Sequence, residues 1–67
     1  MNYRIDLFTA FTLEGAFEQE RITMQVEVDG QMFRASRHFS KENEKNKLIG
    51  ELFIEVGKMI EVWRYKA

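Results

Sequence analysis

Cysteine and proline are absent from this 67-residue sequence, and His38 is its only histidine. The lack of cysteine excludes a disulfide framework, a thiolate metal site and a cysteine nucleophile. With one histidine and no thiolate, the usual ligands of a structural zinc site are missing, so no metal site is expected. Because no cross-link is available to so short a chain, its stability must come from a well-packed core or from further burial by self-association.

A large charge excess and a long apolar run are missing too. Ten basic residues stand against eleven acidic ones, so the net charge of −1 creates no strong field toward nucleic acid or anionic lipid. No run approaches the roughly 20 apolar residues that cross a bilayer. Arg4 and Asp6 carry charge where a secretory signal needs an apolar stretch. We expect a cytoplasmic protein without membrane contact, folded as a single domain over residues 1–67.

The clearest alternation of apolar and polar residues runs from Ile22 to Val28 and predicts a half-buried strand. Asp29-Gly30 follows, and this pair tolerates the positive φ angles that a two-residue type I′ turn requires. The turn predicts a hairpin in which Val28 lies opposite Gln31, where a third strand begins. Counting outward from the turn puts the apolar residues of both strands on one face.

A weaker alternation precedes this hairpin. Over residues 2–13 most apolar side chains share one parity, with Thr9 and Phe8 as exceptions, and this pattern predicts a first strand. Residues 14–16 break the alternation. Residues 17–20 do not resume it, and they are expected to form part of a loop or a loose extension before the second strand.

Apolar residues at helical spacing follow Ser40, whose hydroxyl is expected to cap the helix by accepting from backbone N–H groups of the first turn. Glu42 and Glu44 add negative charge there, which suits the helix dipole. A helix over residues 41–64 would be about 36 Å long at 1.5 Å per residue, long enough to lie across three strands. Its apolar side comprises Leu48, Ile49, Leu52, Phe53, Val56, Met59, Ile60, Val62 and Trp63.

These elements predict an α+β fold, a three-stranded antiparallel β-meander (β-β-β-α) with one long C-terminal helix packed on one face. The other face of the sheet has no second layer, which leaves Phe8 and Met32 without an obvious partner. The expected core consists of Ile5, Leu7, Phe11, Met24, Val26, Phe33 and Phe39 from the sheet and Leu52, Val56, Met59, Ile60 and Trp63 from the helix.

Groups that carry catalysis are scarce in this sequence. His38 has no identifiable carboxylate partner or pocket, and the serines lack the Gly-x-Ser-x-Gly context of a nucleophile elbow. The four glycines are dispersed, so no phosphate-binding loop exists. Glu51 and Glu55 lie one helical turn apart on a solvated face, where such pairs are common. We expect no catalytic residues, no cofactor, no metal and no small-molecule substrate.

Two glycines in the helix indicate an interface. Gly50 and Gly57 are seven residues apart, and each costs about 1 kcal/mol relative to alanine in a helix interior. With Ile54 between them, the spacing is typical of a helix–helix seam, in which small residues let a second backbone approach. The alternative interpretation is that the glycines relieve crowding where the helix crosses the sheet. A second surface, formed by Phe8, Met32 and Arg34 on the uncovered sheet face, is the predicted contact with a partner.

Nucleic-acid binding is the competing prediction. Some three-stranded sheets backed by a helix lay their open face into the DNA major groove. The outer face of this sheet would offer Arg4, Arg34 and His38 for that purpose.

The sequence Val28-Asp29-Gly30 together with residues 39–45 resembles the C-terminal half of a double-stranded RNA-binding domain. That family has three strands followed by a helix that opens with Ser-Lys-Lys-x-Ala-Lys, whose lysines contact phosphates across a groove. Lys41 and Lys45 match two of the lysine positions, Glu42 replaces the third, and the family's first helix has no counterpart. The resemblance covers about half of the chain and implies phosphate contacts at Lys41 and Lys45.

Taken together, these features favour a small, non-enzymatic interaction protein, regulatory or inhibitory, that acts through protein–protein contacts as a homodimer. The helix seam would serve self-association, and the outer sheet face would contact another protein. The alternative is a nucleic-acid-binding module that uses the outer sheet face or the basic start of the helix.

Overall fold

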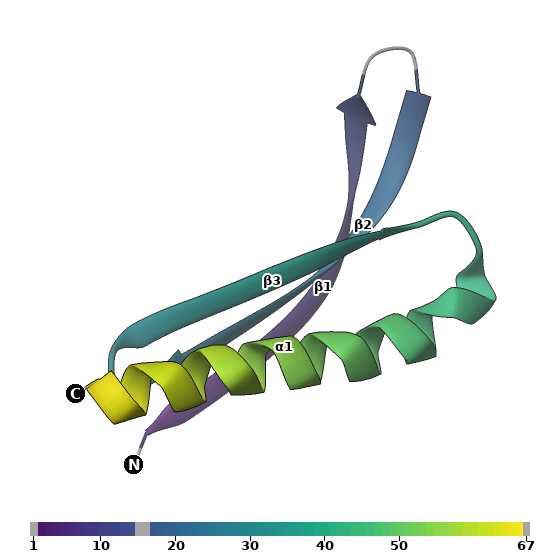
Figure 1. Cartoon of the computed structure of the whole chain (residues 1–67). Helices are drawn as coiled ribbons and strands as arrows, with labels where there is room; N and C mark the ends of the chain where they lie inside the picture. Colours follow the sequence, from purple (N-terminus) through teal and green to yellow (C-terminus); the bar gives the residue numbers. More distant parts are fainter. Residues whose placement is uncertain (1, 15–16, 67) are drawn as a thin grey trace.

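In the computed structural model, three antiparallel strands form one open sheet and a single long helix follows them (Figure 1). The structure describes residues 2–14 and 17–66. The strand order β1-β2-β3 confirms the predicted α+β meander with a C-terminal helix. The elements are β1 (Tyr3–Glu14), β2 (Phe17–Val28), β3 (Gln31–Phe39), a 3₁₀ helix (Glu42–Glu44) and α1 (Lys45–Lys66).

The turn between β2 and β3 has the predicted geometry. Asp29 has a φ of 47° and Gly30 a φ of 86°, both positive as a type I′ turn requires. Val28 lies opposite Gln31, so the predicted register is confirmed along the whole hairpin. The turn also holds the beginning of the chain, because the Asn2 backbone N–H donates to Asp29 Oδ1 at 3.0 Å and the Asp29 N–H donates to the Asn2 carbonyl at 2.9 Å.

The second strand begins earlier than predicted. Residues 17–20 were expected to form part of a loop or a loose extension, but they pair with residues 11–14 as the start of β2, so the loop is wrong and the strand is longer than predicted. Backbone pairing with β1 does not require alternating side chains, and nothing at 17–20 interrupts it. Since β3 ends opposite Glu20, the far end of the β1–β2 hairpin projects beyond the sheet (Figure 1). The predicted break at Gly15 and Ala16 lies outside the described residues.

The core lies between α1 and the two strands β2 and β3. The helix runs antiparallel to β3, with the Trp63 ring edge-on to Phe33 near one end, at 5.6 Å between ring centroids. Phe33, Leu48, Ile49, Ile60 and Trp63 are half-buried around the core. The buried apolar residues are Ile22, Met24, Val26, Val28, Ala35, Phe39, Leu52 and Val56.

The predicted core was wrong about β1. Ile5, Leu7 and Phe11 have the predicted parity, but they are 47%, 44% and 67% exposed, and Met59 is also exposed. A helix is about 10 Å wide and strands lie about 4.8 Å apart, so one helix covers about two strands. The helix is long enough to lie across three strands, but it packs on β2 and β3.

The helix begins differently from the prediction as well. Lys41, not Ser40, occupies the N-cap position of the 3₁₀ helix, and no side chain caps it. Lys45 instead fixes this first turn, since its Nζ donates to Glu42 Oε1 at 2.8 Å and lies 5.3 Å from the centroid of the Phe39 ring. That hydrogen bond raises the pKa of Lys45 above its ordinary value. The α-helix therefore runs from residue 45 to 66 rather than from 41 to 64.

Candidate protein-interaction site

The inner face of β1 is an apolar surface that nothing in the described structure covers. In the register it continues the buried face of β2, because Ile5 lies opposite Val26 and Leu7 opposite Met24. Its apolar members are Tyr3, Ile5, Leu7 and Phe11, all exposed, and we call these four residues the β1 surface.

Single exposed apolar side chains are ordinary, but a contiguous apolar patch on a small protein marks a contact site. The four residues of the β1 surface follow one another along one face of one strand, interrupted only by Thr9. Burying a large apolar side chain stabilises by roughly 1.5–3 kcal/mol, so a partner that covered this surface would gain substantial binding free energy.

One flank of α1 borders the β1 surface. The rotation of the helix is fixed by Arg37 on β3, whose Nη1 donates to Glu55 Oε2 at 2.7 Å. Glu55 therefore lies on the flank of α1 nearer the free edge of β3. Phe53 is two residues away, about 200° around the helix, so it lies on the opposite flank, toward β1. Phe53 is exposed and extends the apolar area from the strand onto the helix.

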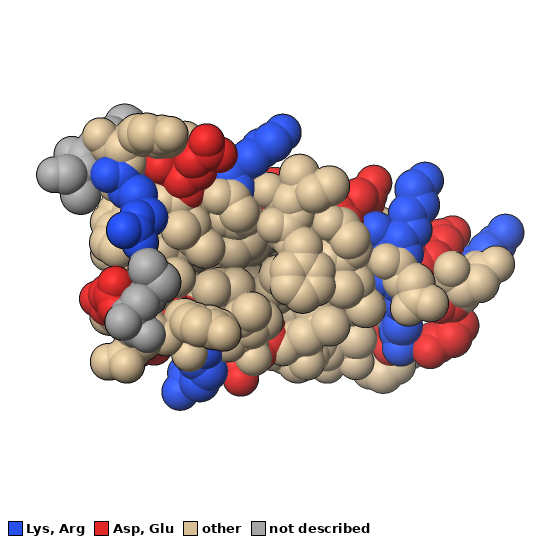
Figure 2. All heavy atoms as spheres, turned by 90° about the horizontal axis from the view of Figure 1, so that it is seen from below, with Lys and Arg blue, Asp and Glu red and all other residues tan. Residues whose placement is uncertain are grey.

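Figure 2 views the molecule from the side on which α1 and the beginning of β1 lie in Figure 1. The middle of this view is a broad uncharged area, and the charged side chains gather toward its ends and margins. This arrangement of an uncharged centre with a charged border is typical of protein–protein contact surfaces.

The glycines of the predicted seam lie in open space. A Cβ atom built on Gly50 or Gly57 would meet nothing within 4 Å, and Ile54 between them is exposed. The interpretation that the glycines relieve crowding against the sheet is therefore wrong. We call Gly50, Ile54 and Gly57 the glycine strip. Gly50 is three residues before Phe53 and Gly57 four after it, so the two glycines adjoin the flank that faces β1. Ile54 lies further round the helix, away from its own sheet, where it lines a shallow hollow with Arg37, Glu51, Glu55 and Lys58.

The outer face of the sheet does not bring Phe8 and Met32 together. Phe8 lies opposite Thr23 in β1–β2, whereas Met32 lies opposite Glu27 in β2–β3, four residue pairs further along β2. Arg34 lies between the two positions, and its Nε donates to Gln25 Oε1 at 3.0 Å. Phe8, Met32 and Arg34 are exposed but separate, and a partner contact through them stays a prediction.

The predicted nucleic-acid contacts on the sheet do share a face. Arg4, Arg34 and His38 all lie on the outer side, but Arg4 forms ion pairs with Asp6 at 3.1 Å and Glu27 at 3.9 Å on the same side. Cations paired in this way present a mixed field rather than a positive one.

At the start of the helix the two predicted phosphate contacts differ. Lys41 is exposed, whereas Lys45 is half-buried, bonded to Glu42 and placed over Phe39. The two lysines therefore differ in exposure and in their contacts within the chain, and phosphate binding at Lys41 and Lys45 stays a prediction.

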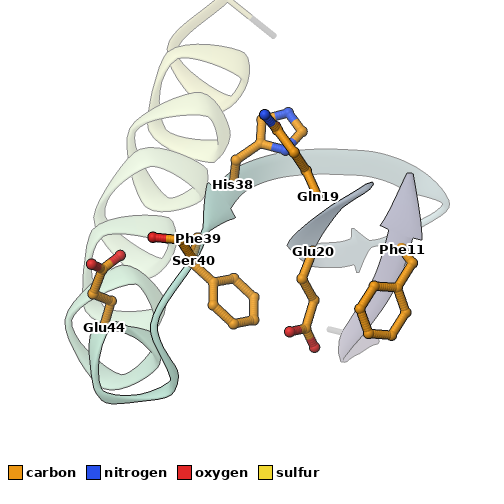
Figure 3. A pocket seen from close by; sticks show the side chains of 7 residues that line it. All are labelled: Phe11, Gln19, Glu20, His38, Phe39, Ser40 and Glu44. Atoms are coloured by element: carbon orange, nitrogen blue, oxygen red, sulfur yellow. The ribbon is translucent and has the colours of Figure 1, made fainter. Parts of the chain in front are cut away.

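A hollow of about 470 Å³ lies where the β1–β2 hairpin leaves β3 (Figure 3). His38 and Gln19 lie near each other on one side, while the carboxylates of Glu20 and Glu44 point elsewhere. Reactive groups that do not converge cannot act on one substrate. Within the described ranges, no group of three His, Cys, Asp or Glu residues is placed to hold a metal ion. The hollow is lined by Phe11, Gln19, Glu20, His38, Phe39, Ser40 and Glu44.

Three features of the site were not predicted from the sequence. The exposure of the β1 surface has no signal in the sequence. The alternation of apolar and polar residues shows which side chains share a face of the sheet, but not whether the helix covers them. The Arg37–Glu55 ion pair had a weak signal, since Arg37 falls on the inner parity of β3. Phe53 was assigned to the apolar side of the helix, and its place at the margin of that side was the available indication of its exposure.

Comparisons with protein-family models, with curated proteins and with solved structures find no match to this chain. The resemblance of residues 28–45 to a double-stranded RNA-binding domain therefore depends on the quoted residues alone. No helix that the structure describes is long and apolar enough to cross a membrane.

Proposed function

We propose that this protein is a non-enzymatic, cytoplasmic binding protein that acts by contact with another polypeptide chain. The observation that carries the proposal is the uncovered inner face of β1, where four large apolar side chains stay exposed beside the core. Exposure of such an apolar surface to water is unfavourable in free energy, and a protein–protein contact removes this unfavourable contribution.

The composition of the surface supports the same function. Tyr3 and Phe11 on β1 and Phe53 on α1 are aromatic, and aromatic residues are enriched at the centres of protein–protein interfaces. Each aromatic ring buries roughly 150–250 Å² of surface when it is fully covered. The protein would act by occupying a surface of its partner, as a regulator or an inhibitor does, and no chemical step is needed.

Nucleic-acid binding is the second candidate, and the shared face of Arg4, Arg34 and His38 supports it. It explains the apolar β1 surface less well, because phosphate contacts require cations and hydrogen-bond donors. Labelled duplex DNA and RNA at low salt provide the test. The alternative predicts an affinity that falls with salt and is lost in Arg34→Glu and Lys41→Glu. Absence of binding at low salt would remove it.

Site-specific photo-crosslinking tests the proposed function. Leu7 and Phe8 are neighbours in β1, are 44% and 45% exposed, and lie on opposite faces of the sheet, so they form a matched pair. A photoreactive phenylalanine analogue is placed at each position in turn, both in the purified protein and in an extract of its source cells. We expect covalent polypeptide adducts from position 7 and few from position 8.

Adducts from position 8 alone would move the contact to the outer face of the sheet. If neither position formed adducts, in the pure protein or in the extract, the proposed function would be wrong.

A further inference from the structure

We infer that the partner is a second copy of this chain, and that the two copies pack with their helices side by side between two outer sheets. In this dimer the glycine strip of each copy lies against the other copy, beside its helix and over its β1 surface. The inference rests on the proposed function, because it names the occupant of the same surface.

The surface area of the isolated chain supports a second copy. The chain exposes 5147 Å², whereas a compact monomer of 8.0 kDa exposes about 4,450 Å². The excess is about 700 Å², against the roughly 800 Å² that each partner contributes to a standard protein–protein interface. The β1–β2 hairpin that projects beyond β3 contributes to this excess, and so does the exposed β1 surface.

The space beside α1 lies over the edge strand of the sheet. Because α1 covers β2 and β3, a strip about one strand wide remains open over β1, and the sheet ends there. A second helix packed at the usual 8–10 Å from α1 would lie over this strip, extend past the edge of the sheet and touch both β1 and the Phe53 flank. A helix laid beside α1 can therefore occupy the open position.

The helix of a second copy presents suitable residues to this position. Gly50, Phe53, Gly57 and Ile60 follow one another at spacings of three and four, so they form one seam along α1. The glycines, with nothing within 4 Å of a Cβ atom, let a second backbone approach closely. Ile54, next to this seam and 62% exposed, is the apolar side chain that can reach the opposing sheet.

A two-fold axis parallel to the helices satisfies all of these contacts at once. Each α1 then has one side on its own sheet, the next side against the other α1, and the third side on the β1 surface of the other copy. The helices run parallel, so Gly57 of one copy lies beside Gly57 of the second copy. The arrangement is isologous and closes on itself, so the same contact does not extend to further copies.

The position of Ile54 along the direction of the strands also allows it to contact the β1 surface of the other copy. Glu55 is level with Arg37 on β3, and the register runs from Arg37 through Ile22 to Thr9 on β1. A parallel two-fold axis preserves this level, so Ile54 of one copy comes to lie beside Leu7 and Thr9 of the other.

Light scattering over a range of protein concentrations tests the dimer. Val62 provides a matched control for Ile54, since it is an apolar residue of the same helix, 52% exposed, and lies seven residues after Glu55 on the flank away from β1. We expect a dimer for the native chain and for Val62→Glu. Ile54→Glu should dimerise at least tenfold more weakly, a change of about 1.4 kcal/mol, while its circular dichroism shows a folded chain.

The absence of cysteine allows the orientation to be tested directly. Single variants Gly57→Cys and Val62→Cys are oxidised mildly. We expect an intermolecular disulfide in Gly57→Cys, because the parallel arrangement brings the two positions within bonding range, and none in Val62→Cys. A disulfide from Val62→Cys without one from Gly57→Cys would overturn the arrangement.

A native chain that is monomeric at every concentration would overturn the dimer itself. If crosslinking from position 7 then still joined the chain to a different polypeptide, the proposed function would stand and the second copy alone would be wrong. If that crosslinking also failed, the proposed function and the dimer would both be wrong.

Discussion

Met24 and Leu7 lie opposite each other in the register of β1 and β2, on the same face of the sheet, yet Met24 is fully buried and Leu7 is 44% exposed. The two residues have similar size and hydrophobicity, and both follow the same alternation. They differ in what surrounds them, because β2 is the central strand and is covered by α1, whereas β1 is an edge strand that α1 does not cover. The difference shows that the lateral position of one helix divides a continuous apolar sheet face into a core and a contact surface.

The largest expected effect is on the free energy of unfolding, when a leucine of the core or a leucine of the β1 surface is shortened to alanine. Leu52→Ala, at a fully buried position, should lower the free energy of unfolding by about 2–5 kcal/mol in urea denaturation. Leu7→Ala should cost less than about 1 kcal/mol at dilutions where the chain is monomeric, because little packing is lost. The loss at Leu7 should grow with protein concentration, as dimerisation adds to stability. Equal losses for both variants at every dilution would contradict the division.

A smaller effect on the free energy of unfolding is expected at Gly57 of the glycine strip, and its sign should change with protein concentration. Gly57→Ala adds a better helix former in open space, so in the monomer it should raise the free energy of unfolding by about 1 kcal/mol. In the dimer the added methyl groups would separate the two helices and weaken association. Denaturation at low and high protein concentration should therefore show stabilisation and destabilisation, respectively. A gain of the same size at both concentrations would argue against contact at Gly57.

A still smaller difference is expected between the coupling energies of two ion pairs, one between β3 and α1 and one within β1. Arg37 and Glu55 join the sheet to the helix at 2.7 Å, while Arg4 and Asp6 form a more exposed pair within β1. A double-mutant cycle with glutamine should give a coupling of about 0.2–1 kcal/mol for Arg37–Glu55, reduced by salt, and a smaller one for Arg4–Asp6. A larger coupling for the β1 pair would mean that β1 is held more firmly than its exposure indicates.

The smallest expected effect is a pH dependence at the helix start. Glu42 raises the pKa of Lys45 in the folded state, so the contribution of this pair to stability is complete at neutral pH and is lost as pH rises through that raised pKa. Urea midpoints of the native chain should fall slightly at strongly alkaline pH, and Lys45→Gln should remove this part of the decline. An unchanged alkaline decline in Lys45→Gln would show that the pair contributes nothing.

The sequence predicted the hairpin well because local rules determine it. The alternation from Ile22 to Val28 and the Asp29-Gly30 turn specify both parity and register without help from distant residues. The strand at 17–20 was missed because it is held by backbone pairing with β1 while its side chains carry no alternation. The helix start was misplaced because the cap preference of Ser40 does not determine it: Lys41 occupies the N-cap position, and the first turn contains the contacts of Lys45 with Glu42 and Phe39.

The candidate site was predicted only in part. The spacing of Gly50, Ile54 and Gly57 was visible in the sequence, since helical periodicity assigns residues to sides of a helix. The exposure of Leu7 was not visible, because periodicity does not report which strands the helix covers. That choice is made by side chains far apart in the sequence, among them Trp63 beside Phe33 and Arg37 bonded to Glu55.

Leu7→Glu and Phe8→Glu provide the most direct measurement of whether the inner face of β1 is the surface that binds. The two positions are adjacent in β1 and almost equally exposed, so the same charge is added to opposite faces of one strand. We expect light scattering to give the molar mass of a monomer for Leu7→Glu and of a dimer for Phe8→Glu and the native chain. A dimer that survives Leu7→Glu, or one that is lost only in Phe8→Glu, would contradict the account.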